Sequence, residues 1–272
     1  MKLARLTPAY AVEAFIWSNL AFLGVDIALA HAENSYARLE EFIPLGFSAL
    51  AALLLLPGLV SARQRQATRR LALFIGGCAI LLGVSGMIYH LASAFFERQT
   101  LTNLVYAAPF IAPLAYVGVG LLLLLSRMQR AEDPEWASWV LFLALGGFAG
   151  NLGLCLLDHA QNGFARPAEW VSVGAAAFGT SFLLVATLRP GERGLQRVTL
   201  GVLALQALVG VAGFVLHLSA DLGRPGDTFA ERLIHGAPLF APLLFSDLAL
   251  LGAIGIWARL RAPKSQEVLR AA

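Results

Sequence analysis

The stretch HAENSYARLEEFIPLGFSALAALLLL, residues 31–56, decides the fold. It opens with polar residues and continues into an apolar run, 42–60, of the length that a helix needs to cross the hydrocarbon core of a membrane. The pattern returns at 159–184 as HAQNGFARPAEWVSVGAAAFGTSFLL, with ten identities in 26 positions aligned without gaps. The chain therefore repeats a unit that joins a polar connection to a predicted membrane-spanning helix.

The composition agrees with a membrane location. Of 272 residues, 58% are hydrophobic and only 14% are charged, with a mean hydropathy of +0.71, whereas a soluble domain of this size needs more charge on its surface. Apolar runs recur along the chain, which predicts an all-α, polytopic protein whose main partner is the lipid bilayer. The eight predicted spans are 9–30, 42–60, 71–95, 104–126, 136–158, 169–188, 197–219 and 236–258.

The distribution of Lys and Arg predicts the orientation. Fifteen of the 20 lie at the two termini and in the connections that follow even-numbered spans. Cationic residues concentrate on the cytoplasmic side, so both termini are predicted to be cytoplasmic in a multi-pass protein of the cell inner (plasma) membrane. The pI near 9.1 reflects these positions and indicates no nucleic-acid partner. The other five cations are Arg38, Arg98, Arg166, Arg224 and Arg232.

Two further stretches extend the repeat. GVSGMIYHLASA (83–94) matches GVAGFVLHLSAD (210–221), and NLVYAAPFIAPL (103–114) matches RLIHGAPLFAPL (232–243). The chain is therefore predicted to consist of two tandem four-helix halves, 1–130 and 131–272. An even number of spans in each half makes the repeats parallel.

All five histidines fall on the predicted outer side, and four of them occupy matched positions in the two halves. The first repeated motif is H-x-x-N-x-x-x-R-x-x-E. Its residues either cap helices, because Asn tolerates left-handed backbone and Glu favours a first helical turn, or they form a metal or proton site. The candidates for a metal site are His31, His159, Glu41 and Glu169, with Asn34, Asn162 and His235 as further site residues.

The second repeated motif is G-x-x-G-x-x-x-H. Its spacing places both glycines on the face of the helix that bears the histidine, so they serve either close helix packing or a flat macrocycle bound by the imidazole. The candidate cofactors are haem b, which is such a macrocycle, or a transition metal ion. The candidate cofactor residues are His90, His217, Gly86 and Gly213.

The third repeated motif is A-P-x-x-A-P, in the predicted spans 104–126 and 236–258. Proline removes an N–H and disrupts the helical hydrogen bonds, so the motif predicts either a kink or a pocket lined by freed carbonyls near the outer side. Asp247 and Glu13 are acidic residues inside predicted spans. Asp247 is expected to have a partner inside the bundle, with Gln206 as the candidate, and Glu13 is expected to reach the headgroups by snorkelling.

Three functions are compatible with these patterns. The first is binding of haem b or a metal ion at an outer histidine-rich site. The second is transport of ions or small solutes, using the proline-broken helices and Asp247. The third is a non-catalytic subunit or assembly factor held among membrane partner subunits. The sequence carries no HExxH, GxSxG, Walker or dinucleotide motif that would indicate an enzyme.

Overall fold

The chain folds into helices and the turns that join them. A computed structural model describes residues 7–225 and 228–261, and no strand occurs within these ranges. Thr7 caps the first helix by accepting a hydrogen bond from the Tyr10 N–H at 3.2 Å. The helices are α1 (Pro8–Ala32), the 3₁₀ helix η1 (Leu39–Glu41), α2 (Phe42–Val60), α3 (Ala62–Ala67), α4 (Arg69–Leu91), α5 (Leu101–Val105), α6 (Leu114–Met128), α7 (Pro134–Gln161), α8 (Glu169–Leu188), α9 (Arg193–Leu222), α10 (Phe229–Ile234) and α11 (Leu243–Arg261).

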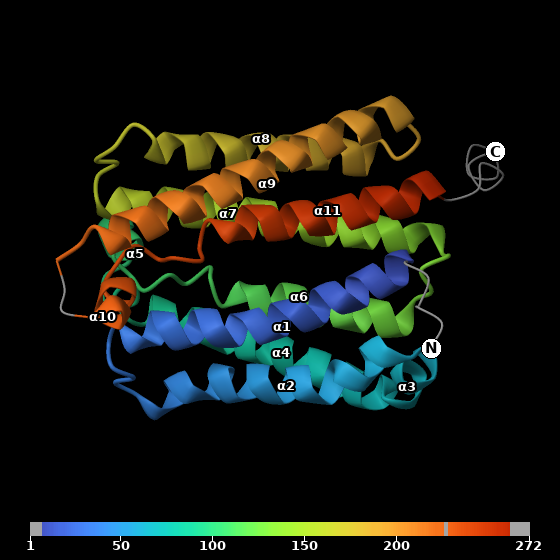
Figure 1. Ribbon diagram of the computed structural model, residues 1–272, viewed down its shortest axis with the longest axis horizontal. Helices are drawn as coiled ribbons and strands as arrows, with labels where there is room; N and C mark the ends of the chain where they lie inside the picture. Colours follow the sequence, from blue (N-terminus) through green and yellow to red (C-terminus); the bar gives the residue numbers. More distant parts are fainter. Residues whose placement is uncertain (1–6, 226–227, 262–272) are drawn as a thin grey trace.

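The long helices form two groups of four. Helices α1, α2, α4 and α6 pack together, as do α7, α8, α9 and α11, and the groups meet where α1 contacts α11 and α6 contacts α7 (Figure 1). All eight run roughly along one axis. We call the end where α1 begins and α11 ends the terminal face, and the opposite end, where α5 and α10 lie, the histidine face.

Seven helices in the described part of the chain are long and apolar enough to cross a membrane, so the molecule is a membrane protein. The fourth predicted span, 104–126, differs from these seven. The stretch 104–126 is not one helix, because α5 ends at Val105 and α6 begins only after Pro113. The 15 residues of α6 cover about 22 Å, less than the ~30 Å of a hydrocarbon core.

The stretch 236–258 is broken in the same way. Helix α10 ends at Ile234 and α11 begins at Leu243, after Pro238 and Pro242. The spans predicted for 104–126 and 236–258 are therefore not continuous helices. The physical reason is that two prolines four residues apart each remove one N–H donor and crowd the preceding turn, and the chain leaves the helix instead of bending within it.

Small residues let helices of the same group approach closely. Between α4 and α6, a Cβ atom added at Gly120 would lie 2.7 Å from the Gly76 carbonyl oxygen, and one at Gly76 would lie 3.1 Å from the Gly120 oxygen. Such contact is possible only between glycines. Close packing of this kind drives helix association in a membrane, because lipid tails are as apolar as the side chains and leave no hydrophobic driving force. The most buried side chains are nevertheless large and apolar, with Trp136 and Phe148 at 1% and 0% exposure.

Candidate functional site

The first repeated motif closes the helix that precedes it in each half. The Tyr36 N–H donates to the His31 carbonyl at 3.1 Å and the Phe164 N–H donates to the His159 carbonyl at 3.0 Å, the six-to-one bond of a Schellman cap. Positive φ falls on residues 35–36 and 163–164, and not on the two asparagines that the sequence had suggested. Tyr36 stacks on Phe42 at the start of α2, and Phe164 stacks on Trp170 in the first turn of α8.

The side chains of this motif form a cluster at the histidine face. In the first half, His31 Nδ1 lies 3.2 Å from Glu41 Oε2, and the Asn34 amide donates to Glu41 Oε1 at 3.4 Å. The side chains of His31 and Glu41 are only 20% and 13% exposed. The carboxylate therefore faces the imidazole and the amide, and no ion pair with Arg38 occurs in the described ranges.

The second half repeats this cluster. His159 Nδ1 lies 3.9 Å from Glu169 Oε2, with side-chain exposures of 21% and 14%, and the Asn162 amide donates to Glu169 Oε1 at 3.5 Å. The same residues at the same burial in both halves place each carboxylate where it can orient an imidazole.

The second and third repeated motifs form one structural unit. His90 Nδ1 is hydrogen-bonded to the Pro109 carbonyl at 3.0 Å, and His217 Nδ1 to the Pro238 carbonyl at 2.9 Å. These carbonyls belong to the segments that left the helix, so the histidines pair the polar groups that the broken helices expose. A polar side chain one turn further on fixes the same segment.

This second contact was not anticipated from the sequence. Ser93 Oγ accepts from the Ala108 N–H at 2.9 Å, and Asp221 Oδ1 accepts from the Ala237 N–H at 2.7 Å. The only signal for it is a short polar residue three or four positions after each histidine. The Ser93 hydroxyl in the first half and the fully buried Asp221 carboxylate in the second therefore accept equivalent backbone hydrogen bonds.

The glycines of the second motif pack against the prolines of the third. A Cβ atom at Gly86 would lie 2.9 Å from Pro113 Cβ, and one at Gly213 would lie 2.7 Å from Pro242 Cβ. A Cβ atom at Gly83 would lie 2.7 Å from the Pro113 carbonyl oxygen, and one at Gly210 would lie 2.8 Å from the Pro242 carbonyl oxygen. The missing side chains are therefore replaced by a proline ring, which is the close-packing role considered above; a role of Gly86 and Gly213 toward a macrocycle stays a prediction.

The histidines approach one another within each half. The ring centroids of His31 and His90 are 6.3 Å apart, with the planes at 45°. His159 and His217 likewise lie within range of an electrostatic interaction. Each half thus combines two imidazoles and one carboxylate, which we call the histidine clusters: His31, His90 and Glu41 in the first half, and His159, His217 and Glu169 in the second.

The fifth histidine links the halves. His235 Nδ1 is hydrogen-bonded to Glu33 Oε2 at 2.9 Å, and both side chains are more than half exposed. At the corresponding place on the other side, the Gln161 amide donates to the Val105 carbonyl at 2.9 Å. Each half therefore contacts the short helix of the other at the histidine face, through an imidazole–carboxylate hydrogen bond on one side and an amide–carbonyl hydrogen bond on the other.

In all five histidines, Nδ1 faces an oxygen atom of the protein. For His90 and His217 the partner is a carbonyl oxygen, which only accepts, so the proton lies on Nδ1 and Nε2 is left as a base or a metal ligand, as in most histidine metal sites. His31 Nδ1 is buried without a hydrogen bond. Within residues 7–225 and 228–261, no group of three or more His, Cys, Asp or Glu side chains is arranged to hold a metal ion. Each histidine cluster contains two imidazoles and one carboxylate, and metal binding by His31, His159, Glu41 and Glu169 stays a prediction.

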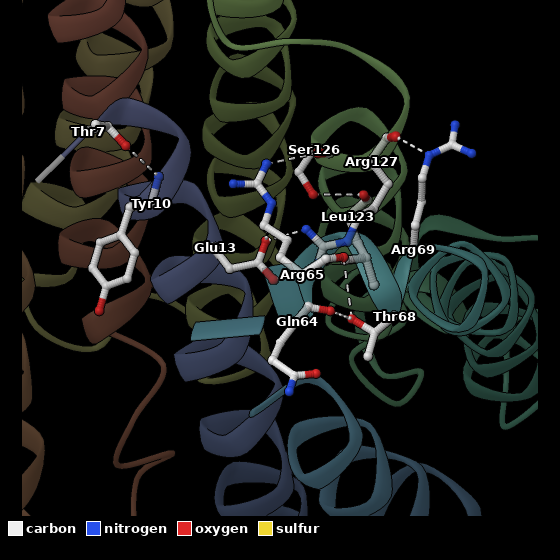
Figure 2. Close-up of polar contacts among 10 residues, drawn as sticks. All are labelled: Thr7, Tyr10, Glu13, Gln64, Arg65, Thr68, Arg69, Leu123, Ser126 and Arg127. Atoms are coloured by element: carbon white, nitrogen blue, oxygen red, sulfur yellow. Dashed lines mark hydrogen bonds and ion pairs between the residues drawn. The ribbon is translucent and has the colours of Figure 1, made fainter. Parts of the chain in front are cut away.

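A buried ion pair lies at the opposite end of the first half (Figure 2). Glu13 on α1 and Arg127 at the end of α6 form two hydrogen bonds, one from Nη1 to Oε2 at 2.6 Å and one from Nη2 to Oε1. Their side chains are 3% and 2% exposed. The expected snorkelling of Glu13 is wrong, because its carboxylate points into the bundle toward a fixed guanidinium and not toward the membrane surface.

Arg65 extends this network from the connecting helix α3. Its Nε lies 3.6 Å from Glu13 Oε2 and its Nη2 donates to the Ser126 carbonyl at 3.1 Å (Figure 2). Burial lowers the pKa of the Arg65 guanidinium, and the negative charge of Glu13 acts in the opposite direction. The nearby Arg69 donates to the Arg127 carbonyl at 2.9 Å, so two arginines satisfy the open carbonyls at the end of α6.

Asp247 has a partner from the other half of the molecule. The Asn19 amide on α1 donates to Asp247 Oδ1 on α11 at 2.9 Å. The expected partner, Gln206, instead has both side-chain polar atoms buried without a hydrogen bond. The bond between Asn19 and Asp247 joins the two groups of helices near the middle of their length.

No protein-family model, no curated protein sequence and no solved structure matches this chain.

Proposed function

We propose that this protein is an eight-span membrane protein made of two tandem halves, 1–130 and 131–272, with both termini in the cytoplasm. Supporting this are the equivalent contacts in the two halves, including those of His90 and His217 with proline carbonyls. The broken spans reach across the membrane when the non-helical segments after α5 and α10 are counted with α6 and α11. Such segments are tolerated at membrane depth when protein groups bind their carbonyls.

We further propose that each histidine cluster binds one transition metal ion on the non-cytoplasmic side, through His31 and His90 in the first half and His159 and His217 in the second. The observations that carry this are the 6.3 Å between the ring centroids of His31 and His90 and the hydrogen bonds that join Nδ1 of His90 and of His217 to proline carbonyls. Two imidazole nitrogens at ~2.0 Å from one ion place their ring centroids about 5 Å apart at a tetrahedral angle and about 6 Å apart at a linear one, and the observed 6.3 Å matches the wide angle. Imidazole ligands suit copper and zinc.

Haem b is the alternative occupant of the same histidines. A porphyrin needs a flat space beside its ligand, and the glycine faces next to His90 and His217 are covered by Pro113 and Pro242. An ion needs no such space. The geometry therefore favours an ion, whose remaining coordination positions would be filled by water or by a molecule delivered from outside.

Metal analysis of the purified full-length protein tests the proposal. After addition of excess copper or zinc and removal of free metal, we expect two ions per chain, and an absorption spectrum without a Soret band. A Soret band in protein made with haem supplied would identify haem as the occupant. Neither metal nor haem retained in stoichiometric amount would contradict the proposed site altogether.

Cysteine labelling tests whether the short helix α6 completes a span. In a background with Cys78 and Cys155 replaced by Ala, Glu97→Cys and Glu132→Cys place one exposed thiol on each side of the α5–α6 segment. A membrane-impermeant maleimide added to intact cells or spheroplasts is expected to label Glu97→Cys and to reach Glu132→Cys only after lysis. Equal labelling of both before lysis would show that the segment does not cross.

A further inference from the structure

An apolar groove runs along the contact between the two halves, on the side of the terminal face. It encloses about 790 Å³ between α1 and α11, with one residue each from α2 and α9. Phe15 and Ile254 form its buried floor, and Ala11, Ala14 and Ala253 leave the space that larger side chains would fill. Tyr10 and Ser18 are the hydroxyl-bearing residues of a lining that is otherwise without charged or amide groups.

The groove extends through most of one membrane leaflet. Its lining on α1 runs from Tyr10 to Ser18, about 12 Å along the helix, whereas half of a hydrocarbon core is about 15 Å. On α11 it follows residues 250, 253, 254 and 257, and Asp247 lies one turn further along the same face. The bond between Asn19 and Asp247 therefore marks the deep end of the groove, near the middle of the membrane.

The lining of the groove selects among occupants, because all its side chains except those of Tyr10 and Ser18 lack a hydroxyl, amide or charged group. Water is not expected to fill a site with so few polar groups. An extended hydrocarbon chain fits the shape, the lining and the surrounding medium.

The mouth of the groove carries a positive charge. Trp257 lines the groove, and the Arg261 guanidinium lies over its indole ring, 4.6 Å from the centroid. Arg261 is exposed at the end of α11, at the level where phospholipid headgroups meet the hydrocarbon core. A guanidinium held in this position binds phosphate oxygens well.

We propose that the groove is a binding site for an anionic phospholipid, with one acyl chain along α1 and α11 and the phosphate on Arg261. The lipid would bridge the two halves next to the contact between α1 and α11. This inference does not depend on the histidine clusters, nor on which compartment the terminal face meets.

The test compares phosphatidylglycerol with phosphatidylcholine of identical acyl chains, each added to the delipidated full-length protein and measured as bound lipid. We expect tighter binding of phosphatidylglycerol. Arg261→Gln should lower this preference about fivefold, the effect of one basic residue at a membrane surface, whereas Arg197→Gln on α9 should leave it unchanged. Leu250→Trp should reduce the binding of both lipids by more than tenfold, because the indole occupies the groove.

A matched variant separates groove binding from general lipid contact. Leu121 occupies the position on α6 that corresponds to Leu250 on α11; the two are 40% and 54% exposed, and Leu121 does not line the groove. Leu121→Trp should bind both lipids as the unmodified protein does. Equal lipid binding by the two Trp variants, or a headgroup preference that survives Arg261→Gln, would overturn the proposal, with the melting temperature of each variant confirming that it is folded.

Discussion

The substitution His90→Asn is expected to lower the metal retained by the purified protein from two ions per chain to one. The substitution removes one of the two imidazoles of the first histidine cluster and leaves the second cluster unchanged. Loss of a residue that only orients a ligand weakens metal binding by about 10–100-fold, so loss of a ligand should weaken it by more than about 100-fold. The measurement is metal content by mass spectrometry after dialysis against a range of free-metal concentrations.

The two halves supply the controls for this experiment. His217→Asn should also leave one ion, and the double variant should leave none. His235→Asn, which removes the exposed histidine bound to Glu33, should leave two. A single variant that loses both ions, or a double variant that keeps both, would contradict two independent sites.

The sequence predicted the helices well where composition alone decides them. The bounds of α2 and α8 agree with the predicted spans, because an apolar run flanked by polar residues has no other stable form in lipid. The sequence also pointed to the residues of the histidine clusters, because both halves retain them. It could not show whether the A-P-x-x-A-P motif bends a helix or ends it, since that depends on whether nearby side chains can bind the freed carbonyls.

The sequence did not predict which polar side chains pair between distant helices. Glu13 and Arg127 are 114 residues apart, and Asn19 and Asp247 are 228 apart. Each pair is set by which faces of distant helices meet, and a single sequence carries no record of that. The second half does not reveal the first of these pairs either, because it has Leu141 and Ile256 at the corresponding positions.

Glu13→Ala is expected to destabilise the protein by about 3–5 kcal/mol, the largest effect of a single substitution that we predict. It leaves the Arg127 guanidinium buried without its carboxylate, and an uncompensated buried charge costs far more than the pair contributed. The free energy of unfolding in mixed detergent micelles measures this. As the control, Glu132→Ala breaks the exposed pair with Arg130 near the same face and should cost less than about 1 kcal/mol.

The second half indicates how to restore that loss. Leu141 and Ile256 occupy the positions that correspond to Glu13 and Arg127, and both are fully buried. The double variant Glu13→Leu, Arg127→Ile removes both charges together, and such replacements are often neutral or stabilising, so we expect stability within about 1 kcal/mol of the unmodified protein or above it. A double variant as unstable as Glu13→Ala would mean that the network of Arg65 and Arg69 at the end of α6 requires the carboxylate itself. Recovery would mean that the ion pair adds little net stability, and that its presence in one half only is a matter of specificity.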